Sequence, residues 1–171
     1  MDWELILLRI VHIGSAMIWF GGAIIGGFFL GPTAKALGQA GQPFMDHLIK
    51  RRRMGMVFPI VAALTVLSGV ALYWRASGGL QEAWVTSPSG LAFTVGGVAA
   101  IISFVGGLVL VGPSFAEQAA VQAELAGGDG VLSESQRQRL ARADRKMQLA
   151  TRFDLPLLLL AALTMAVARY L

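Results

Sequence analysis

The sequence has no cysteine and few charged residues. With no cysteine among its 171 residues, the chain cannot form a disulfide framework, a thiolate metal site or a cysteine nucleophile. Charged side chains make up 14% of the chain, whereas a soluble domain usually carries about 25%. At the same time, 56% of the residues are hydrophobic. This composition predicts a membrane protein, because few soluble folds could bury so much apolar surface.

The chain is also basic, with 14 Lys and Arg residues against 10 Asp and Glu residues. Such an excess can indicate nucleic-acid binding. Here, however, the positive charges lie mainly in two loops beside apolar segments, where they more often set the orientation in a membrane. We therefore expect membrane lipid, and no nucleic acid, as a partner. A signal peptide is not expected, since the first residues are acidic and the apolar run that follows them is too long.

Four apolar segments each approach the length of about 20 residues that a helix needs to cross a bilayer. The short alternating segments of a membrane barrel are absent from the sequence. The sequence therefore predicts an all-α, polytopic membrane protein with a single domain over residues 1–171. We expect a four-transmembrane-helix bundle built from two helical hairpins. The predicted spans cover residues 5–30, 54–73, 91–111 and 149–168.

Basic residues are concentrated in two of the three loops, while the loop between the second and third spans holds only Arg75. The positive-inside rule then places the first and third loops in the cytoplasm and both termini outside. We expect a multi-pass protein of the bacterial inner membrane. The basic residues are Lys35, Lys50, Arg51, Arg52 and Arg53 in the first loop, and Arg137, Arg139, Arg142, Arg145 and Lys146 in the third, with Arg152 just beyond it.

The third loop is itself predicted to be helical. A good helix-forming segment follows Pro113, and the glycine-rich run Gly127–Gly130 breaks it. Ser133 can cap a second helix that continues into the fourth span. The sequence thus predicts a helical hairpin over about 113–148 that projects into the cytoplasm.

A weak internal repeat relates the two halves of the chain. The first and third spans both end in a Gly-Gly pair that is soon followed by Gly-Pro, at Gly31-Pro32 and at Gly112-Pro113. The second and fourth spans both contain a proline and then the run Ala-Ala-Leu-Thr, which ends at Thr65 and at Thr164. Two hairpins in the same orientation would explain both matches. Chance similarity among apolar residues is the alternative.

His12 is the leading candidate for chemistry. It shares one helical face with small residues such as Ser15 and Gly22, so we expect it to point into the bundle, next to space for a flat ring. A neutral imidazole there could ligate a haem iron or a copper ion. The alternative is a structural histidine that hydrogen-bonds a carbonyl or hydroxyl group of another helix. The other histidine, His47, lies in the first loop, too far away to share one metal with His12 within one subunit.

Two further residues are candidates for cofactor binding beside His12. Arg9 lies one helical turn before it and could pair with a haem propionate. Its alternative role is to extend towards the lipid headgroups. Met165 is expected in the outer half of the fourth span, at a depth similar to that of His12, and could be a sixth iron ligand. Its alternative role is simple packing.

Charged residues near the inner end of the bundle suggest other roles. Asp154 lies just inside the fourth span and could pair with Arg152 or Arg53, or act in a proton relay. The run Lys50–Arg53 is first an orientation signal and second a site for anionic lipid.

Several residues of the first two spans form a family pattern. They are His12, the run Trp19-Phe20-Gly21-Gly22, Arg53, Pro59, Gly69 and Trp74. This pattern resembles the superfamily of small membrane proteins that includes the copper-resistance protein D domain and the HemJ-type protoporphyrinogen oxidases, and the chain is most similar to its uncharacterised members. The resemblance implies a four-helix bundle associated with haem or copper, with a haem-binding histidine at the position of His12.

Three functions are open on these grounds, and the sequence does not decide whether the protein is an enzyme. The first is a protein that binds a b-type haem near the outer face, for membrane redox or haem-linked oxidation. The second is a non-enzymatic membrane subunit or assembly factor, in a homo-oligomer or a larger membrane complex. The third is a copper or small-solute permease.

Overall fold

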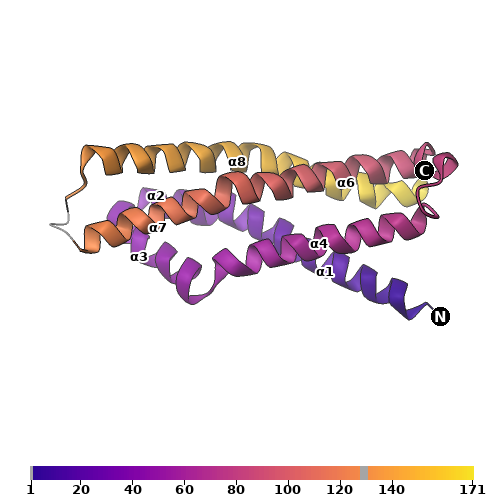
Figure 1. The fold of residues 1–171 in the computed structure, drawn as a ribbon, viewed down its shortest axis with the longest axis horizontal. Coiled ribbons are helices and arrows are strands. Elements are labelled where there is room, and N and C mark those ends of the chain that lie inside the picture. The colour runs from indigo at the N-terminus through magenta and orange to yellow at the C-terminus, as the bar shows by residue number, and fades with distance from the viewer. Residues whose placement is uncertain (1, 128–130) are drawn as a thin grey trace.

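The chain is almost entirely helical and forms four long helical segments that run along one axis (Figure 1). The computed structural model describes residues 2–127 and 131–171, without the side chains of residues 39 and 42. Four helices are long and apolar enough to cross a membrane, which confirms the four predicted spans. The elements are α1 (Trp3–Ile24), η1 (Ile25–Leu30), α2 (Gly31–Ala36), η2 (Gly38–Ala40), α3 (Gly41–Asp46), η3 (His47–Arg51), α4 (Met54–Ala76), α5 (Glu82–Val85), α6 (Pro88–Gly106), η4 (Gly107–Val111), α7 (Gly112–Ala126), α8 (Glu134–Val167) and η5 (Ala168–Tyr170).

Side chains in the sequence set where the long helices begin. The Asp2 carboxylate accepts a hydrogen bond of 3.1 Å from the backbone N–H of Leu5 and so caps α1. Ser87 caps α6 in the same way, with Pro88 at its first position. Ser133 and Gln136 form a reciprocal capping box at the start of α8. This confirms the predicted cap at Ser133 and the predicted continuous helix into the fourth span.

The four spans associate as two pairs, in which α1 packs mainly against α4 and α6 packs mainly against α8 (Figure 1). The close approach in each pair occurs at equivalent positions of the predicted repeat. Ser15 and Gly96 each lie 17 residues before the proline of their Gly-Pro step. The Ser15 hydroxyl is 2.8 Å from Thr65 Oγ1, and a Cβ atom on Gly96 would lie 2.6 Å from Thr164 Oγ1. This shared geometry favours a true repeat over chance similarity.

A turn of π-helix precedes each Gly-Pro step, at η1 and at η4. Each proline then occupies one of the first positions of the following helix, α2 or α7, where its missing N–H costs nothing. The long segments therefore change pitch at the predicted ends of the first and third spans without stopping.

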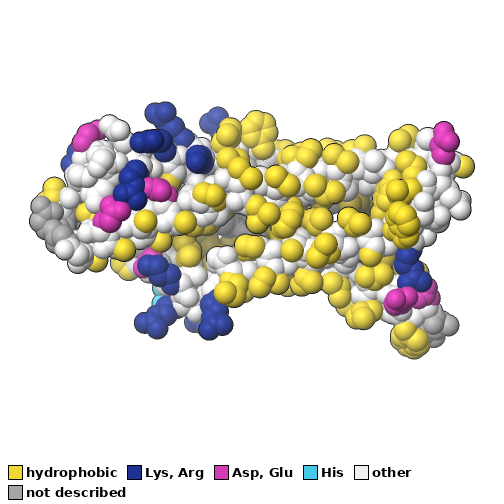
Figure 2. Space-filling view, viewed as in Figure 1, with side chains coloured by type: hydrophobic (Ala, Val, Ile, Leu, Met, Phe, Trp, Pro, Cys, Tyr) yellow, Lys and Arg dark blue, Asp and Glu magenta, His cyan; other side chains and the backbone are white. Residues whose placement is uncertain are grey.

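The core between the two pairs is small and centred on Trp19. The Trp19 ring packs with Ala62 and Leu158, and it meets the Phe104 ring edge-on at a centroid distance of 6.4 Å. Most other large apolar side chains point outward, and Figure 2 shows them as a broad yellow band along the face in view. In water this surface would be an aggregation hazard; in a bilayer it faces lipid. The chain is therefore a multi-pass membrane protein.

The two ends of the bundle differ. Both termini lie at one end, where Arg75 pairs with Asp2 and with Glu4, each at 2.8 Å, and so joins the start of α1 to the end of α4 (Figure 1). At the other end α7 and the first part of α8 extend as an antiparallel pair, as the hairpin over 113–148 predicted. Residues 128–130 of the predicted break lie outside the described part of the chain.

Candidate functional site

His12 lies on the face of α1 that contacts α4. Its Nδ1 atom is 2.8 Å from the backbone carbonyl oxygen of Thr65. The Ser68 hydroxyl lies further away, 3.4 Å from the same nitrogen, and it also donates to the carbonyl oxygen of Leu64. The strong partner of Nδ1 is therefore the Thr65 carbonyl.

This contact fixes the tautomer of the imidazole ring. A carbonyl oxygen can only accept a hydrogen bond, so Nδ1 must carry the proton, and in the neutral ring Nε2 is left with its lone pair. Nε2 has no hydrogen bond to any described residue, and it is not sealed away from the surface of the protein. His12 thus presents a bare ring nitrogen, which is the form of histidine that binds metals.

The imidazole ring of His12 lies against Gly69 of α4. A Cβ atom at Gly69 would lie 2.8 Å from His12 Cε1 and 3.2 Å from Nδ1, too close for any side chain larger than hydrogen. Glycine at this position therefore lets the ring enter the contact between the two helices.

The space expected for a flat ring beside His12 is occupied by α4 at two of the small residues of α1. Ser15 contacts Thr65, and Gly22 is covered by the Phe58 ring, since a Cβ atom at Gly22 would lie 2.0 Å from Phe58 Cε1. At Ser15 and Gly22 the small residues of α1 receive α4, because close helix contact is what small residues favour in lipid. Any ligand of Nε2 must approach from the surface side of the α1–α4 pair.

Hydroxyl groups next to His12 are satisfied within the protein. Ser15 Oγ lies 2.6 Å from the carbonyl oxygen of Val11, and Thr65 Oγ1 lies 2.8 Å from that of Val61. Ser15 is therefore a helix-packing residue with its hydroxyl returned to its own backbone. The bond to the Thr65 carbonyl is the contact with another helix that the alternative role of His12 predicted, although the sequence did not identify Thr65, Ser68 or Gly69 as the residues involved. The pattern that could have indicated them is the helical spacing of small and hydroxylated residues on α4.

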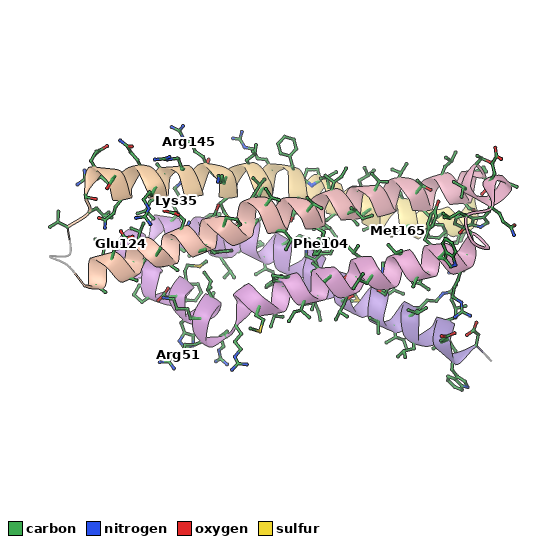
Figure 3. The ribbon with its side chains drawn as sticks, in the orientation of Figure 1. Lys35, Arg51, Phe104, Glu124, Arg145 and Met165 are labelled. Carbon is green, nitrogen blue, oxygen red and sulfur yellow. The ribbon has the colours of Figure 1, made fainter. Side chains whose placement is uncertain are left out.

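Met165 takes part in the second helix pair, whereas His12 lies in the first. Met165 lies on α8 against α6, where a Cβ atom at Gly96 would be 2.9 Å from its Cγ (Figure 3). It thus takes part in the close contact of the second helix pair. Arg9 lies one turn before His12, exposed and without an ion pair to any described residue. It remains available to an anionic group near the end that carries the termini.

Asp154 has a different partner from the two arginines that were expected. The hydroxyl of Ser103, a buried residue of α6, donates to Asp154 Oδ1. Within the described residues, neither Arg152 nor Arg53 forms an ion pair with this carboxylate. The prediction of an arginine partner is wrong because Asp154 faces α6, while Arg152 and Arg53 are exposed at the surface. The contact still joins α6 to α8, as a structural role requires.

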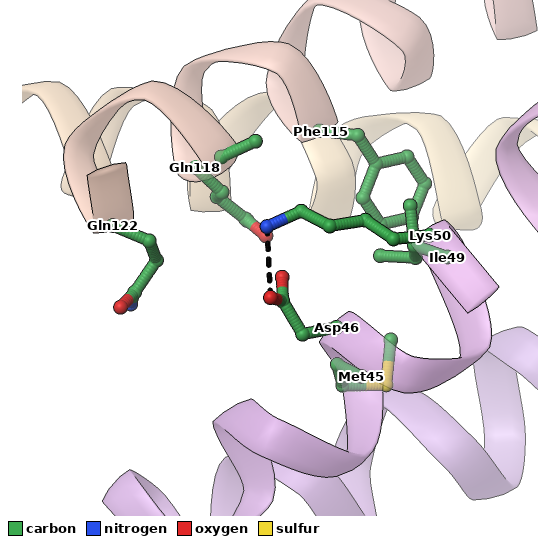
Figure 4. A pocket seen from close by; sticks show the side chains of 8 residues that line it. Met45, Asp46, Ile49, Lys50, Phe115, Gln118 and Gln122 are labelled. Carbon is green, nitrogen blue, oxygen red and sulfur yellow. Dashed lines mark hydrogen bonds and ion pairs between the residues drawn. The ribbon is translucent and has the colours of Figure 1, made fainter. Parts of the chain in front are cut away.

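A small pocket lies at the hairpin end, between α3, η3 and α7 (Figure 4). Its polar groups include an ion pair of 2.8 Å between Lys50 and Asp46, together with Gln118 and Gln122.

His47 is exposed at the start of η3, at the opposite end of the bundle from His12. The two histidines therefore cannot meet on one metal within a subunit, as expected.

Other metal donors do not gather anywhere in the described part of the chain: no group of three or more His, Cys, Asp or Glu side chains comes together there. A copper site would thus need most of its ligands from elsewhere, whereas a haem iron needs only one protein ligand.

No family model, no curated protein and no solved structure matches the chain. The site is therefore interpreted from its own geometry.

Proposed function

We propose that this membrane protein binds a b-type haem through Nε2 of His12, near the end of the bundle that carries both termini, and serves membrane redox or haem-linked oxidation. The observation that supports the proposal most is the 2.8 Å hydrogen bond from Nδ1 to the Thr65 carbonyl. Histidines that ligate metals almost always donate their other ring N–H to such an acceptor, which orients the ring and makes the ligating nitrogen more basic.

The residues around His12 fit this role in part. Arg9 lies one turn nearer the termini and is unpaired among the described residues, so it is the candidate partner of a propionate. Met165 packs against Gly96 in the other helix pair. Within the subunit, His12 would be the residue that holds the haem iron. The bound haem would supply one-electron chemistry, and the protein supplies the ligand, its orientation and the charge beside it.

Orientation and family are part of the same proposal. The basic residues of the hairpin end support a cytoplasmic hairpin and outward termini in a bacterial inner membrane. The resemblance of the first two spans to the family that includes the copper-resistance protein D domain and the HemJ-type oxidases implies haem or copper, and the haem reading follows from the haem-binding histidine that it places at His12.

The test is the reduced-minus-oxidised visible spectrum of the purified protein, expressed with a supply of haem. The wild type and His47→Ala should both show the Soret and α bands of a b-type haem, and His12→Ala should lack them while keeping its helical circular dichroism. His47→Ala is the matched control, because His47 is exposed at the other end of the bundle. A wild-type protein without a Soret band, or a band unchanged in His12→Ala, would contradict the proposal.

A second candidate function is a non-enzymatic subunit of a larger membrane complex, supported by the hairpin of α7 and α8 that extends beyond the apolar band. Removal of residues 116–140 should then reduce the size of the assembly on a native gel and leave the haem spectrum intact. An unchanged size would leave this candidate without support.

A further inference from the structure

Positive charges at the hairpin end fall into a paired and an unpaired group. Lys35 pairs with Asp144 at 2.9 Å, and Lys50 pairs with Asp46 at 2.8 Å. Arg139 pairs with two carboxylates of α7. The others are exposed and have no ion pair to any residue that the structure describes. This unpaired group consists of Arg51, Arg52, Arg53, Arg137, Arg142, Arg145, Lys146 and Arg152.

Two acidic groups that could compensate the arginine run are already engaged. Asp46, on the preceding helix, holds Lys50, and Asp154 accepts from Ser103. Within the described residues, the run Arg51–Arg53 therefore has no ion pair that compensates its charge. The chain turns sharply there, since Arg53 has φ = 56°, in the left-handed region, just before α4 begins.

Most of the unpaired group lies where a bilayer surface would be. From Arg53 to Arg75, at the other end of α4, a helix rises about 33 Å, close to the thickness of a hydrocarbon core. Figure 2 shows the dark blue side chains at the edge of the yellow apolar band, on opposite sides of the bundle. Figure 3 labels Arg51 on one side and Arg145 on the other, both pointing away from the helices.

We propose that the cationic collar formed by Arg51, Arg52, Arg53, Arg145, Lys146 and Arg152 binds the headgroups of anionic phospholipids in the leaflet at the hairpin end. The collar adjoins the apolar band, so its nearest anions are lipid phosphates already concentrated in the headgroup layer. Guanidinium groups suit phosphate oxygens because they present several donors in a plane. Each such charge near an anionic surface changes binding by about fivefold.

The experiment measures the association of spin-labelled phosphatidylglycerol and phosphatidylcholine with the full chain in bilayers, by electron spin resonance. The wild type should prefer phosphatidylglycerol, and the preference should fall as salt is raised. The triple variant Arg51→Gln, Arg52→Gln, Arg53→Gln should lose most of it, by at least about fivefold.

Two controls separate lipid binding from a general effect of charge. Changing the three arginines to lysine keeps the charge and should keep most of the preference. Arg137→Gln removes an unpaired charge about 22 Å further along α8 than Arg152, beyond a Debye length of about 8 Å from the headgroups, and should change nothing. No preference in the wild type, or an equal preference in the glutamine triple variant, would overturn the proposal. If that variant does not fold, Arg145→Gln with Lys146→Gln gives the same comparison on the other side of the bundle.

Discussion

At the scale of single residues, His12 and Gly69 have to be considered together. The imidazole can reach the Thr65 carbonyl only because position 69 has no side chain, since a Cβ atom there would lie 2.8 Å from His12 Cε1. The bare Nε2 atom is thus a consequence of a glycine on a different helix. His12, which the sequence identifies, is thus a candidate ligand because of Gly69, a residue that has no side-chain chemistry of its own.

Gly69→Ala should therefore lower both stability and haem retention. The added methyl group must push the ring or the helix aside, and overpacking of this kind costs about 1–3 kcal/mol. Thermal unfolding in detergent measures the first effect and the Soret band measures the second. Gly14→Ala is the control, because Gly14 lies two residues from His12 and a Cβ atom there would meet nothing within 4 Å. Equal behaviour of the two variants would contradict the role given to Gly69.

Part of this site could be predicted from the sequence and part could not. His12 stands out because a polar ring in an apolar span is expensive. The Thr65 contact is invisible in the sequence, because every residue carries a backbone carbonyl. Space for a flat ring was wrongly predicted because Ser15 and Gly22 indicate close approach without indicating what approaches. Here it is α4.

At the scale of elements, Arg139 links the two helices of the α7–α8 hairpin. Arg139 donates to Glu117, and its Nη1 lies 2.7 Å from Glu124 Oε1. These two carboxylates, Glu117 first, raise the pKa of Arg139 above its ordinary value. In return the hydrogen bonds from Gln136 and then from Arg139 lower the pKa of Glu124. The ion pairs are exposed, so each contributes little on its own.

The lowered pKa of Glu124 predicts that the α7–α8 hairpin loses stability in acid. A carboxyl group with a lowered pKa in the folded state adds stability that is present above its unfolded pKa, about 4.3, and is lost as the pH falls through the lowered value. Amide protection over residues 114–126, corrected for intrinsic exchange, should therefore drop below about pH 4 in the wild type. Glu124→Gln should be less protected at neutral pH and should respond less to acid. A variant with the full wild-type pH response would contradict this assignment.

The sequence predicted where the helices begin and end from local residues, but it did not predict the contact between Asp154 and α6. Ser133 and the Gly-Pro steps determine the backbone only within a few residues on either side, so their effects on the helices can be predicted from the sequence. The contact between Asp154 and Ser103 joins positions 51 residues apart. Arg152 is much nearer to Asp154 along the chain than Ser103 is, but Asp154 faces α6 while Arg152 lies at the surface.

At the scale of the whole molecule, the fold presents an apolar band with a cationic end and an end that carries both termini. Because the chain has no cysteine, single cysteines can report on each end. A cysteine at Gln81, exposed between α4 and α6, should react with an impermeant maleimide on intact cells, and one at Ser135 only after permeabilisation. Reaction of Ser135→Cys alone on intact cells would reverse the orientation, and equal reaction of both would contradict the four-span fold.

The proposed function depends on the state of one ring, since haem ligation needs His12 to offer a bare Nε2. The most direct measurement is the nitrogen-15 spectrum of the histidines in the haem-free protein in bilayers, at mildly alkaline pH. The chain has only two histidines, so His47→Gln leaves a single imidazole to observe. We expect a protonated Nδ1 and an unprotonated Nε2, with the Nδ1 signal shifted by its hydrogen bond to a carbonyl. A proton on Nε2 with Nδ1 bare would contradict the account.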